Sequence, residues 1–240
     1  KTCLFAGSVW IGAYDNAGNI KVAAQSYRQS NSNDYFTGPI STLTGSPDVS
    51  ATTCNAYDTL WKINRSDVVN FINTGVTTPD IASWPGNGNI ANGELPQLAP
   101  YEDVNGDGIY NTADGDYPRY NFTNNFPIDT LSGEFNCNNY LFGDQTLWWV
   151  FNDVGNLKTE TYSAAIGIEV RAQAFSFVTT NGINNCTFYN FQVINRTSIT
   201  YDSTFFGMWT DWDLGDPSDD WLGCDSIRGL GYCYNSTNND

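Results

Sequence analysis

Residues 103–114 place oxygen-bearing groups at the spacing of a calcium-binding loop. The groups stand at loop positions 1, 3, 5, 7, 9 and 12, and they come from Asp103, Asn105, Asp107, the Ile109 carbonyl, Asn111 and Asp114. Calcium takes about six to eight oxygen ligands, and a glycine at position 6 allows the sharp turn that such a loop needs. Gly108 occupies that position. We therefore expect these six residues to bind calcium as a cofactor.

The alternative explanation is that Asp, Asn and Gly are common in any polar turn. Six matching positions argue against chance. The pattern departs from the EF-hand at Asp114, where the EF-hand has a bidentate Glu; dockerin modules and related extracellular loops use the shorter Asp. Pro100, Gly115 and Pro118 flank the loop and leave no room for two helices. We expect a loop between strands that acts as a structural clamp, because no helix pair is available to open on binding.

A second group of carboxylates follows the last long apolar run. It comprises Asp211, Asp213, Asp216, Asp219 and Asp220, with Asp225 close behind. Closely spaced carboxylates repel one another unless a cation or a proton lies among them, so a second calcium site is the first interpretation and a solvated or capping turn is the second. The third is a glycosidase pair, one carboxylic acid and one base or nucleophile, with neighbouring tryptophans stacked on sugar rings.

Histidine is absent from the sequence. This excludes Ser-His-Asp and Cys-His nucleophilic machinery and the HExxH zinc site. We predict that the chain is not an enzyme, with glycoside hydrolysis by the carboxylates as the alternative.

Composition and charge indicate a globular, exported protein. Of 240 residues, 40% are hydrophobic and 15% aromatic, enough for a substantial core. The 26 acidic residues outnumber the 10 basic ones, and the net charge of -16 disfavours nucleic acid and anionic membranes as partners. No apolar run reaches transmembrane length, so we expect no membrane insertion. Abundant Asn, Thr, Ser, Gly and Tyr are typical of secreted β-rich proteins, which predicts an extracellular location.

Six cysteines are compatible with three disulfides, in any of about fifteen pairings. Only Cys224 and Cys233 lie close enough in the sequence to suggest a local pair, and we expect a disulfide between them. Buried free thiols are the alternative.

Apolar and aromatic runs with period-two alternation predict a mainly β fold, an antiparallel β-sandwich or jelly-roll-like domain. A hairpin is expected from residues 4–14 and 20–27, and further strands from residues 147–152, 164–178, 187–195 and 204–211. In the second of these strands, Gly167 and Glu169 are expected on the face away from the core. One short helix is expected at residues 66–73, with Ser66 as N-cap, an apolar face of Val68, Phe71 and Ile72, and Gly75 beyond its end.

We expect residues 1–240 to form a single β-rich domain, part of a longer protein. Residues 74–131 are dense in Pro, Gly, Asn and Asp. They are expected to form a long excursion pinned by calcium, in which metal ligation replaces a hydrophobic core.

Several blocks of sequence, taken in order, resemble a region of large secreted Bacteroidetes proteins that carry a type IX secretion sorting domain. The blocks cover nearly the whole chain and are residues 9–12, 23–29, 34–39, 84–88, 98–101, 115–118, 143–145, 148–153, 194–196 and 211–215, with 219–220 and 223–225. One departure is Tyr35-Phe36-Thr37, where the family often has Phe-Trp-Pro before Gly-Pro.

The resemblance implies an exported, surface-associated or released module of multidomain adhesin-like proteins. Asp-Ser/Thr-apolar tripeptides also look like the O-glycosylation acceptors of Bacteroidetes, and the candidate residues are Thr59, Thr130, Ser203 and Ser226. We therefore expect an extracellular, calcium-stabilised structural or adhesive module whose partners are other copies, other surface proteins or a glycan. A filament or a larger surface assembly is the expected context. The alternative is a carbohydrate-binding or glycoside-hydrolase module.

Overall fold

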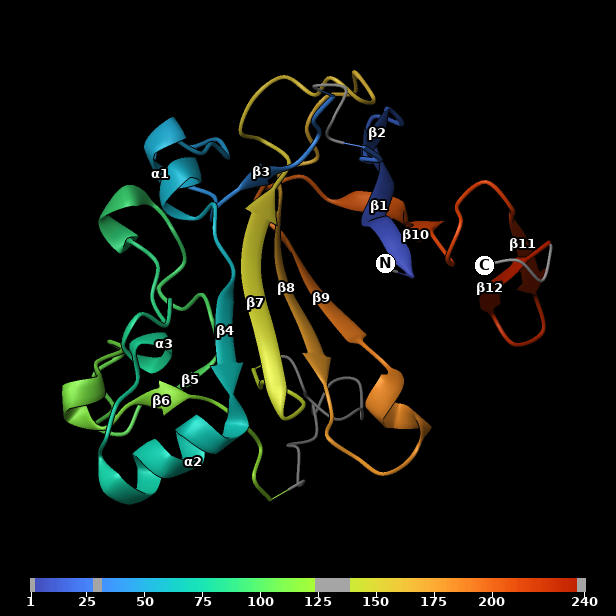
Figure 1. The fold of residues 1–240 in the computed structure, drawn as a ribbon. Coiled ribbons are helices and arrows are strands. Elements are labelled where there is room, and N and C mark those ends of the chain that lie inside the picture. Colours follow the sequence, from blue (N-terminus) through green and yellow to red (C-terminus); the bar gives the residue numbers. More distant parts are fainter. Residues whose placement is uncertain (1–2, 28–31, 124–138, 237–240) are drawn as a thin grey trace. The chain divides into compact units, whose positions relative to one another are not determined.

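The computed structural model describes residues 3–27, 32–123 and 139–236. The chain is mainly β, with 38% strand and 14% helix arranged in several antiparallel sheets, which agrees with the predicted β-sandwich-like class. It packs as two compact units (Figure 1). Unit 1 comprises Lys1–Tyr35, Leu157–Ile166 and Ile199–Asp240, and unit 2 comprises Phe36–Asn156 and Gly167–Ser198.

Unit 1 contains the predicted N-terminal hairpin. Strand β1 (Leu4–Asp15) pairs with β2 (Ile20–Ala23) on one side and with β10 (Tyr201–Trp212) on the other. The connecting turn is held by the Asp15 carboxylate, which accepts the backbone N–H groups of Ala17 at 3.0 Å and Asn19 at 2.9 Å. The second strand of the hairpin ends at Ala23, earlier than the predicted residue 27. A separate hairpin, β11 (Asp220–Asp225) with β12 (Leu230–Asn235), was not predicted.

Unit 2 is built on a five-stranded antiparallel sheet. Its central strand β7 (Gln145–Asn152) pairs with β8 (Ile168–Ser176), and β8 pairs with β9 (Phe188–Asn195). The short strands β3 (Phe36–Thr37) and β4 (Trp61–Asn64) both pair with β7. The predicted strands are confirmed, with β8 starting at residue 168 rather than 164. The expectation that Glu169 faces away from the core is wrong, because this side chain is fully buried.

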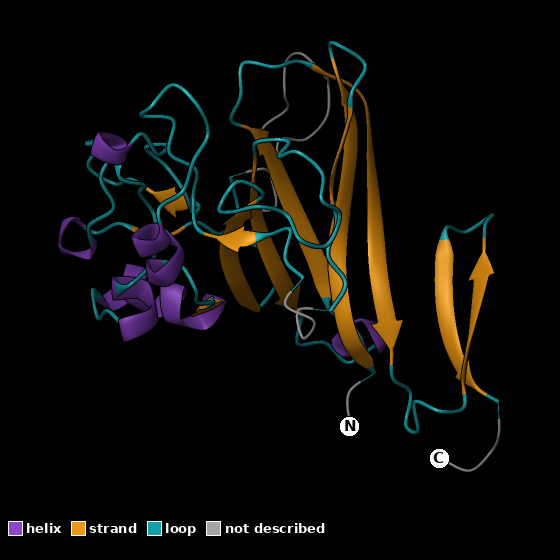
Figure 2. Ribbon diagram, turned by 90° about the horizontal axis from the view of Figure 1, so that it is seen from above, coloured by secondary structure: helices purple, strands orange, loops and turns teal. Residues whose placement is uncertain are grey.

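Three α-helices are present in the described residues, where one was expected. They are α1 (Ala51–Ala56), α2 (Arg65–Thr74) and α3 (Pro79–Ala82). Figures 1 and 2 show them on one side of the sheet of unit 2, and α2 and α3 contact β4. The described part of the chain also contains three short 3-10 helices: η2 (Ile90–Asn92), η3 (Thr112–Asp114) and η4 (Gly182–Asn185).

The predicted helix is α2, with corrected boundaries. Its N-cap is Asn64 rather than Ser66, and it ends, as expected, before Gly75 in the left-handed conformation at φ 71°. Val68 and Phe71 are buried as predicted, whereas Ile72 is 44% exposed, so the apolar face is narrower than the sequence suggested.

Residues 74–131 contribute to the hydrophobic core of unit 2, so the prediction that metal ligation replaces a core there is wrong. Buried side chains from this segment pack with those of β4, α2 and β7, and they are Ile81, Trp84, Leu98, Ala99, Tyr101 and Tyr120. The ring centroids of Trp84 and of Trp148 on β7 are 6.0 Å apart. These apolar residues are isolated among prolines and glycines, so they form no periodic pattern from which their burial could be predicted.

The predicted disulfide between Cys224 and Cys233 is not formed. In the pairing of β11 with β12, Cys224 lies opposite Gly231 and Cys233 lies opposite Leu222, so the two cysteines are diagonal neighbours. Diagonal positions are about 7–8 Å apart between Cα atoms, beyond the usual span of a disulfide. All five cysteines in the described residues are free thiols; Cys137 lies outside them. None is fully buried, which departs from the alternative of buried thiols.

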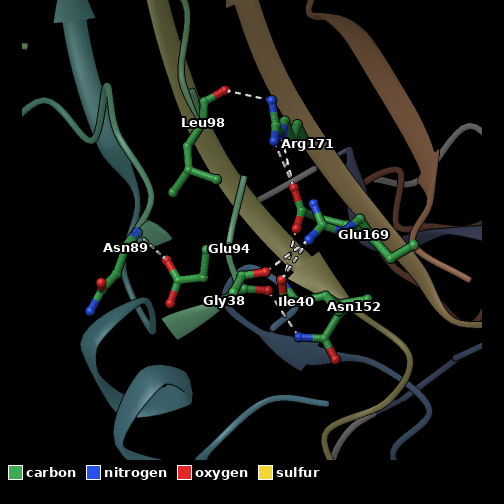
Figure 3. A network of polar contacts seen from close by, with 10 residues as sticks. Gly38, Ile40, Asn89, Glu94, Leu98, Asn152, Glu169 and Arg171 are labelled. Atoms are coloured by element: carbon green, nitrogen blue, oxygen red, sulfur yellow. Dashed lines mark hydrogen bonds and ion pairs between the residues drawn. The ribbon is translucent and has the colours of Figure 1, made fainter. Parts of the chain in front are cut away.

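A buried ion pair joins the sheet to the loops of unit 2 (Figure 3). The Glu169 carboxylate accepts hydrogen bonds from Nε and Nη2 of Arg171 at 2.9 and 2.8 Å and from the Ile40 N–H at 2.9 Å. Arg171 Nη1 donates to the Leu98 carbonyl at 3.1 Å. The ion pair therefore fixes two separate loops, one at Ile40 through Glu169 and one at Leu98 through Arg171. A buried charge is stable only when it is paired and hydrogen-bonded.

Replacing Arg171 with Ala is expected to destabilise unit 2 by about 3–5 kcal/mol, since the buried Glu169 charge would lose its partner. Urea unfolding measures the change. The double variant Glu169→Gln/Arg171→Met is expected to recover part of the loss, because it removes both charges together. As a control, Arg228→Ala breaks the ion pair with Asp225, in which the Arg228 side chain is 77% exposed, and should change stability far less. Equal effects of the two single variants would contradict the argument.

Buried tyrosines make unit 2 sensitive to alkaline pH. Burial raises the pKa of Tyr120 to about 12 and that of Tyr57 to about 12. A folded-state pKa above the unfolded value of about 10 gives stability that is present below pH 10 and is lost between pH 10 and 12. For Tyr120 the loss is at most about 3 kcal/mol.

Urea unfolding from pH 8 to 11.5 should show this decline, and Tyr120→Phe should reduce its slope. The matched control is Tyr189→Phe on β9, where the side chain is 49% exposed. A slope that is unchanged by Tyr120→Phe would show that other groups cause the decline.

Candidate calcium loop

Two short strands hold the predicted calcium loop. Strand β5 (Tyr101–Glu102) pairs antiparallel with β6 (Tyr117–Pro118), so the loop connects the two strands of a small hairpin. Tyr101 is buried in the core of unit 2, which places the start of the loop directly above that core. The loop therefore lies between strands, as the flanking prolines predicted.

The carboxylate of Asp103 organises the first half of the loop. Its Oδ1 accepts the backbone N–H groups of Gly106 at 2.7 Å and Asp107 at 3.2 Å, and its Oδ2 accepts that of Gly108 at 2.8 Å. Gly108 has φ 79°, a left-handed conformation that favours glycine, which confirms the predicted sharp turn. The chain is thus curled around the first predicted ligand.

The next predicted ligands are bonded to one another. Asn105 Oδ1 accepts the Asp107 N–H at 3.0 Å, and Asn105 Nδ2 donates to Asp107 Oδ2 at 3.0 Å. Asp107 Oδ1 accepts the Ile109 N–H at 2.8 Å, which leaves the Ile109 carbonyl oxygen as the predicted backbone ligand. These contacts link loop positions 3, 5 and 7 in sequence.

The last two predicted ligands form a second small group. Asn111 is the N-cap of η3, because its Oδ1 accepts the Ala113 N–H at 3.1 Å. Its Nδ2 donates to Asp114 Oδ2 at 2.6 Å. Within the described residues no three Asp, Glu, Cys or His side chains gather in a group that could hold a metal ion, so the ligand set would combine carboxylates with amide and carbonyl oxygens.

Asp116 is a functional residue that the sequence reasoning missed. Its side chain is fully buried. One oxygen accepts the Val104 N–H at 2.8 Å and the other accepts the Asn111 N–H at 2.9 Å, so a single carboxylate ties both ends of the loop. The only sequence signal is an acidic residue directly before β6, too weak to assign this role.

The outer part of the loop is fastened to the core by an asparagine and a tyrosine. Asn87 Nδ2 donates to the Gly108 carbonyl at 2.9 Å, and its Oδ1 accepts the Tyr110 N–H. The Tyr110 hydroxyl donates to the Ile81 carbonyl at 2.7 Å. Burial raises the pKa of Tyr110, so the hydroxyl keeps its proton at neutral pH and remains a donor.

Three carboxylates of the second predicted site accept hydrogen bonds, one of them from the distant Tyr27. Asp211 Oδ2 accepts the Tyr27 hydroxyl at 2.5 Å, which raises the pKa of that tyrosine. Asp216 Oδ1 accepts the N–H and Oγ–H of Ser218 at 3.0 and 2.8 Å, as a capping turn would. Asp220 Oδ2 accepts the Leu214 N–H at 2.9 Å. The Asp213 N–H donates to the Cys3 carbonyl at 3.3 Å, and the Asp219 N–H donates to the Asp216 carbonyl at 3.3 Å.

One pair of atoms in this region fits the metal interpretation. Asp220 Oδ1 and Asn235 Oδ1 are buried and have no hydrogen-bond partner among the described residues. Asp220 and Asn235 face each other across β11 and β12. The second calcium site stays a prediction.

Three of the candidate glycosylation residues are exposed, namely Thr59, Ser203 and Ser226. Thr130 lies outside the described residues.

In the described part of the chain, no helix has the length and apolarity needed to cross a membrane. Comparison of the chain with protein-family models, with curated proteins and with solved structures finds no match.

Replacing Asp116 with Asn is expected to destabilise unit 2 by about 1–3 kcal/mol, because an amide nitrogen would face one of the two N–H groups and leave it buried without an acceptor. Thermal unfolding in the absence of calcium measures this. The control is Asp58→Asn, the same change of charge at an exposed turn. A destabilisation no larger than that of the control would show that Asp116 does not hold the loop.

Proposed function

We propose that residues 103–114 bind calcium and that the chain is a calcium-stabilised structural or adhesive module. The observation that carries the proposal is the curl of the loop around Asp103, whose carboxylate gathers the N–H groups at loop positions 4, 5 and 6. An ionised carboxylate has about four lone-pair sites, so three N–H bonds leave one for a cation.

The donor set fits calcium. It consists of hard oxygen atoms from carboxylates, amides and one backbone carbonyl, which calcium prefers to nitrogen or sulfur. The residues that would hold the ion are Asp103, Asn105, Asp107, Ile109, Asn111 and Asp114. Bound calcium would neutralise the mutual repulsion of the three carboxylates, and nothing in this role requires catalysis.

Calcium binding would raise the free energy of unfolding of unit 2. The loop is bonded to Asn87 and, through Tyr110, to the carbonyl of the buried Ile81. A ligand that binds only the folded form stabilises it by RT ln(1 + [L]/Kd). Because the loop has no pair of helices that could open, a clamp is favoured over a sensor.

An extracellular location is consistent with this type of loop. Calcium sites of extracellular modules have dissociation constants of about 10⁻⁴–10⁻³ M, suited to the calcium level outside cells. The net charge of -16 gives such an ion a favourable field. Together with the resemblance to type IX-secreted Bacteroidetes proteins, this supports a secreted or cell-surface module, glycosylated at exposed residues such as Thr59 and part of a filament or larger surface assembly.

Catalysis is the weaker alternative. A glycosidase needs one carboxylic acid and one carboxylate open to the sugar and to water. Asp211 and Asp216 are bonded to Tyr27 and Ser218. A turn that caps itself, with or without a second calcium ion, accounts for these contacts with fewer assumptions.

Calcium added to chelator-stripped protein is expected to bind with measurable heat and to raise the melting temperature. At a calcium concentration 100 times the Kd the gain is about 2.7 kcal/mol, roughly 5–10 °C for a chain of this size. Calorimetry with thermal unfolding at each step measures both. A stoichiometry of two would assign the second ion to the Asp220 and Asn235 region, which Asn235→Ala should then remove.

Asp103→Asn is expected to abolish the calcium-dependent rise in melting temperature, because the ligand loses its charge and one acceptor oxygen. Asp58→Asn, with the same change of charge at an exposed position, should leave the rise intact. No heat and no stabilisation in the unmodified protein would overturn the proposed function.

A further inference from the structure

An open depression of about 400 Å³ adjoins the calcium loop. It is lined by β5, by the calcium loop, by the residue that follows β6 and by two further segments, through Pro96, Gln97, Tyr101, Glu102, Asp103, Gly108, Arg119 and Asn139. Asp103 and Gly108 belong to the loop as well. The volume lies within the range of about 300–1,000 Å³ that small-molecule sites occupy.

Two of the three charged side chains in this depression, Glu102 and Arg119, are paired with each other. Arg119 Nε lies 2.9 Å from Glu102 Oε2, with 31% and 39% of the two side chains exposed. The guanidinium also stacks over the Tyr140 ring, 4.8 Å from its centroid, which fixes its plane. Both Asp103 oxygens accept backbone N–H groups. The depression therefore combines the Glu102–Arg119 ion pair with the Asp103 carboxylate, which backbone N–H groups hold in place.

The neutral groups present donors and acceptors side by side. Gln97 Nε2 donates to Asn139 Oδ1 at 3.1 Å. In the described residues, no hydrogen bond engages Gln97 Oε1 or the Asn139 amide N–H groups, so an acceptor and a donor remain for a ligand. The Tyr101 hydroxyl accepts a bond from Asn87 Nδ2 at 3.2 Å, and its own proton remains to be donated.

We infer that this depression binds a neutral sugar. A hydroxyl group both donates and accepts, so adjacent hydroxyls of a pyranose match alternating donors and acceptors that no single ion would satisfy. Anionic ligands are disfavoured by the net charge of -16. A basic peptide side chain is disfavoured by Arg119, which also neutralises Glu102. Pro96 and Tyr101 line the depression and would supply the apolar contact that sugar C–H groups need.

Sugar binding should be coupled to calcium binding, and this part of the inference rests on the proposed function. Asp103 is the first ligand of the loop and also lines the depression. A calcium ion that fixes its carboxylate would therefore preorganise the sugar site. Coupling between two sites is reciprocal, so the sugar should tighten calcium binding by the same factor.

The test is an NMR titration of the full chain with the methyl glycosides of glucose, galactose, mannose and N-acetylglucosamine, first with calcium and then with chelator. At least one glycoside is expected to bind saturably to the calcium-loaded protein, with shifts centred on Gln97, Tyr101 and Asn139. Gln97→Ala should weaken binding at least tenfold without changing calcium affinity. The matched control is Gln145→Ala. Gln145, on β7, donates an equivalent hydrogen bond of 2.9 Å to Asn64 Oδ1, and its loss should leave glycoside binding unchanged.

The outcomes separate the two proposals. Calcium binding without any glycoside binding, or glycoside binding unaffected by Gln97→Ala, overturns the sugar site and leaves the proposed function standing. Glycoside binding that disappears in Gln97→Ala while calcium does not bind overturns the proposed function and supports the sugar site. N-acetyl-lysine amide is the competing probe, and its binding at Gln97 in place of the glycosides would assign the depression to a basic peptide and overturn the inference.

Discussion

The pairing of the buried Glu169 charge is the constraint on which unit 2 depends. A carboxylate with no exposed surface on β8 must be neutralised and hydrogen-bonded where it stands. Arg171, two residues along the same strand, supplies the charge, and the Ile40 N–H supplies a further bond. Arg171 then reaches the Leu98 carbonyl. The ion pair that neutralises Glu169 therefore also holds two loops against the sheet, at Ile40 and at Leu98.

The position of the calcium loop follows from that arrangement. Leu98 is buried in the core, and Tyr101, three residues further on, begins β5. A loop that starts at Asp103 is consequently held by the core below it and by Asn87 beside it. The depression lined by Gln97 and Asp103 lies along the same stretch of chain. The loop and the candidate ligand site therefore both lie on the segment that the ion pair holds at Leu98.

Local signals in the sequence predicted local structure. Spacing of oxygen-bearing residues located the loop and its turn at Gly108, and Gly75 marked the end of α2. Apolar and aromatic runs located β1 and β7, and period-two alternation located β8 and β9. Contacts between residues far apart in the chain could not be predicted from the sequence. From the sequence alone, Glu169 is expected to face outward as an exposed charge. Its burial depends on Arg171, two residues away on the same strand, and on the Ile40 N–H, 129 residues distant, and the sequence indicates neither contact. The role of Asp116 could not be predicted either, because its carboxylate can bond the N–H groups of Val104 and Asn111 only once β5 and β6 have paired.

The two hydrogen bonds of Asp116 across the loop bear on how the loop would bind the proposed calcium ion. Because one buried carboxylate holds Val104 and Asn111 in the folded chain, the conformational entropy of closing the loop is lost during folding and not again during ion capture. Ion capture by such a loop requires only the loss of water from the metal and small rotations of side chains. The association rate would then be governed by dehydration of the cation, and differences in affinity among variants of this loop would appear mainly in the rate at which the ion leaves.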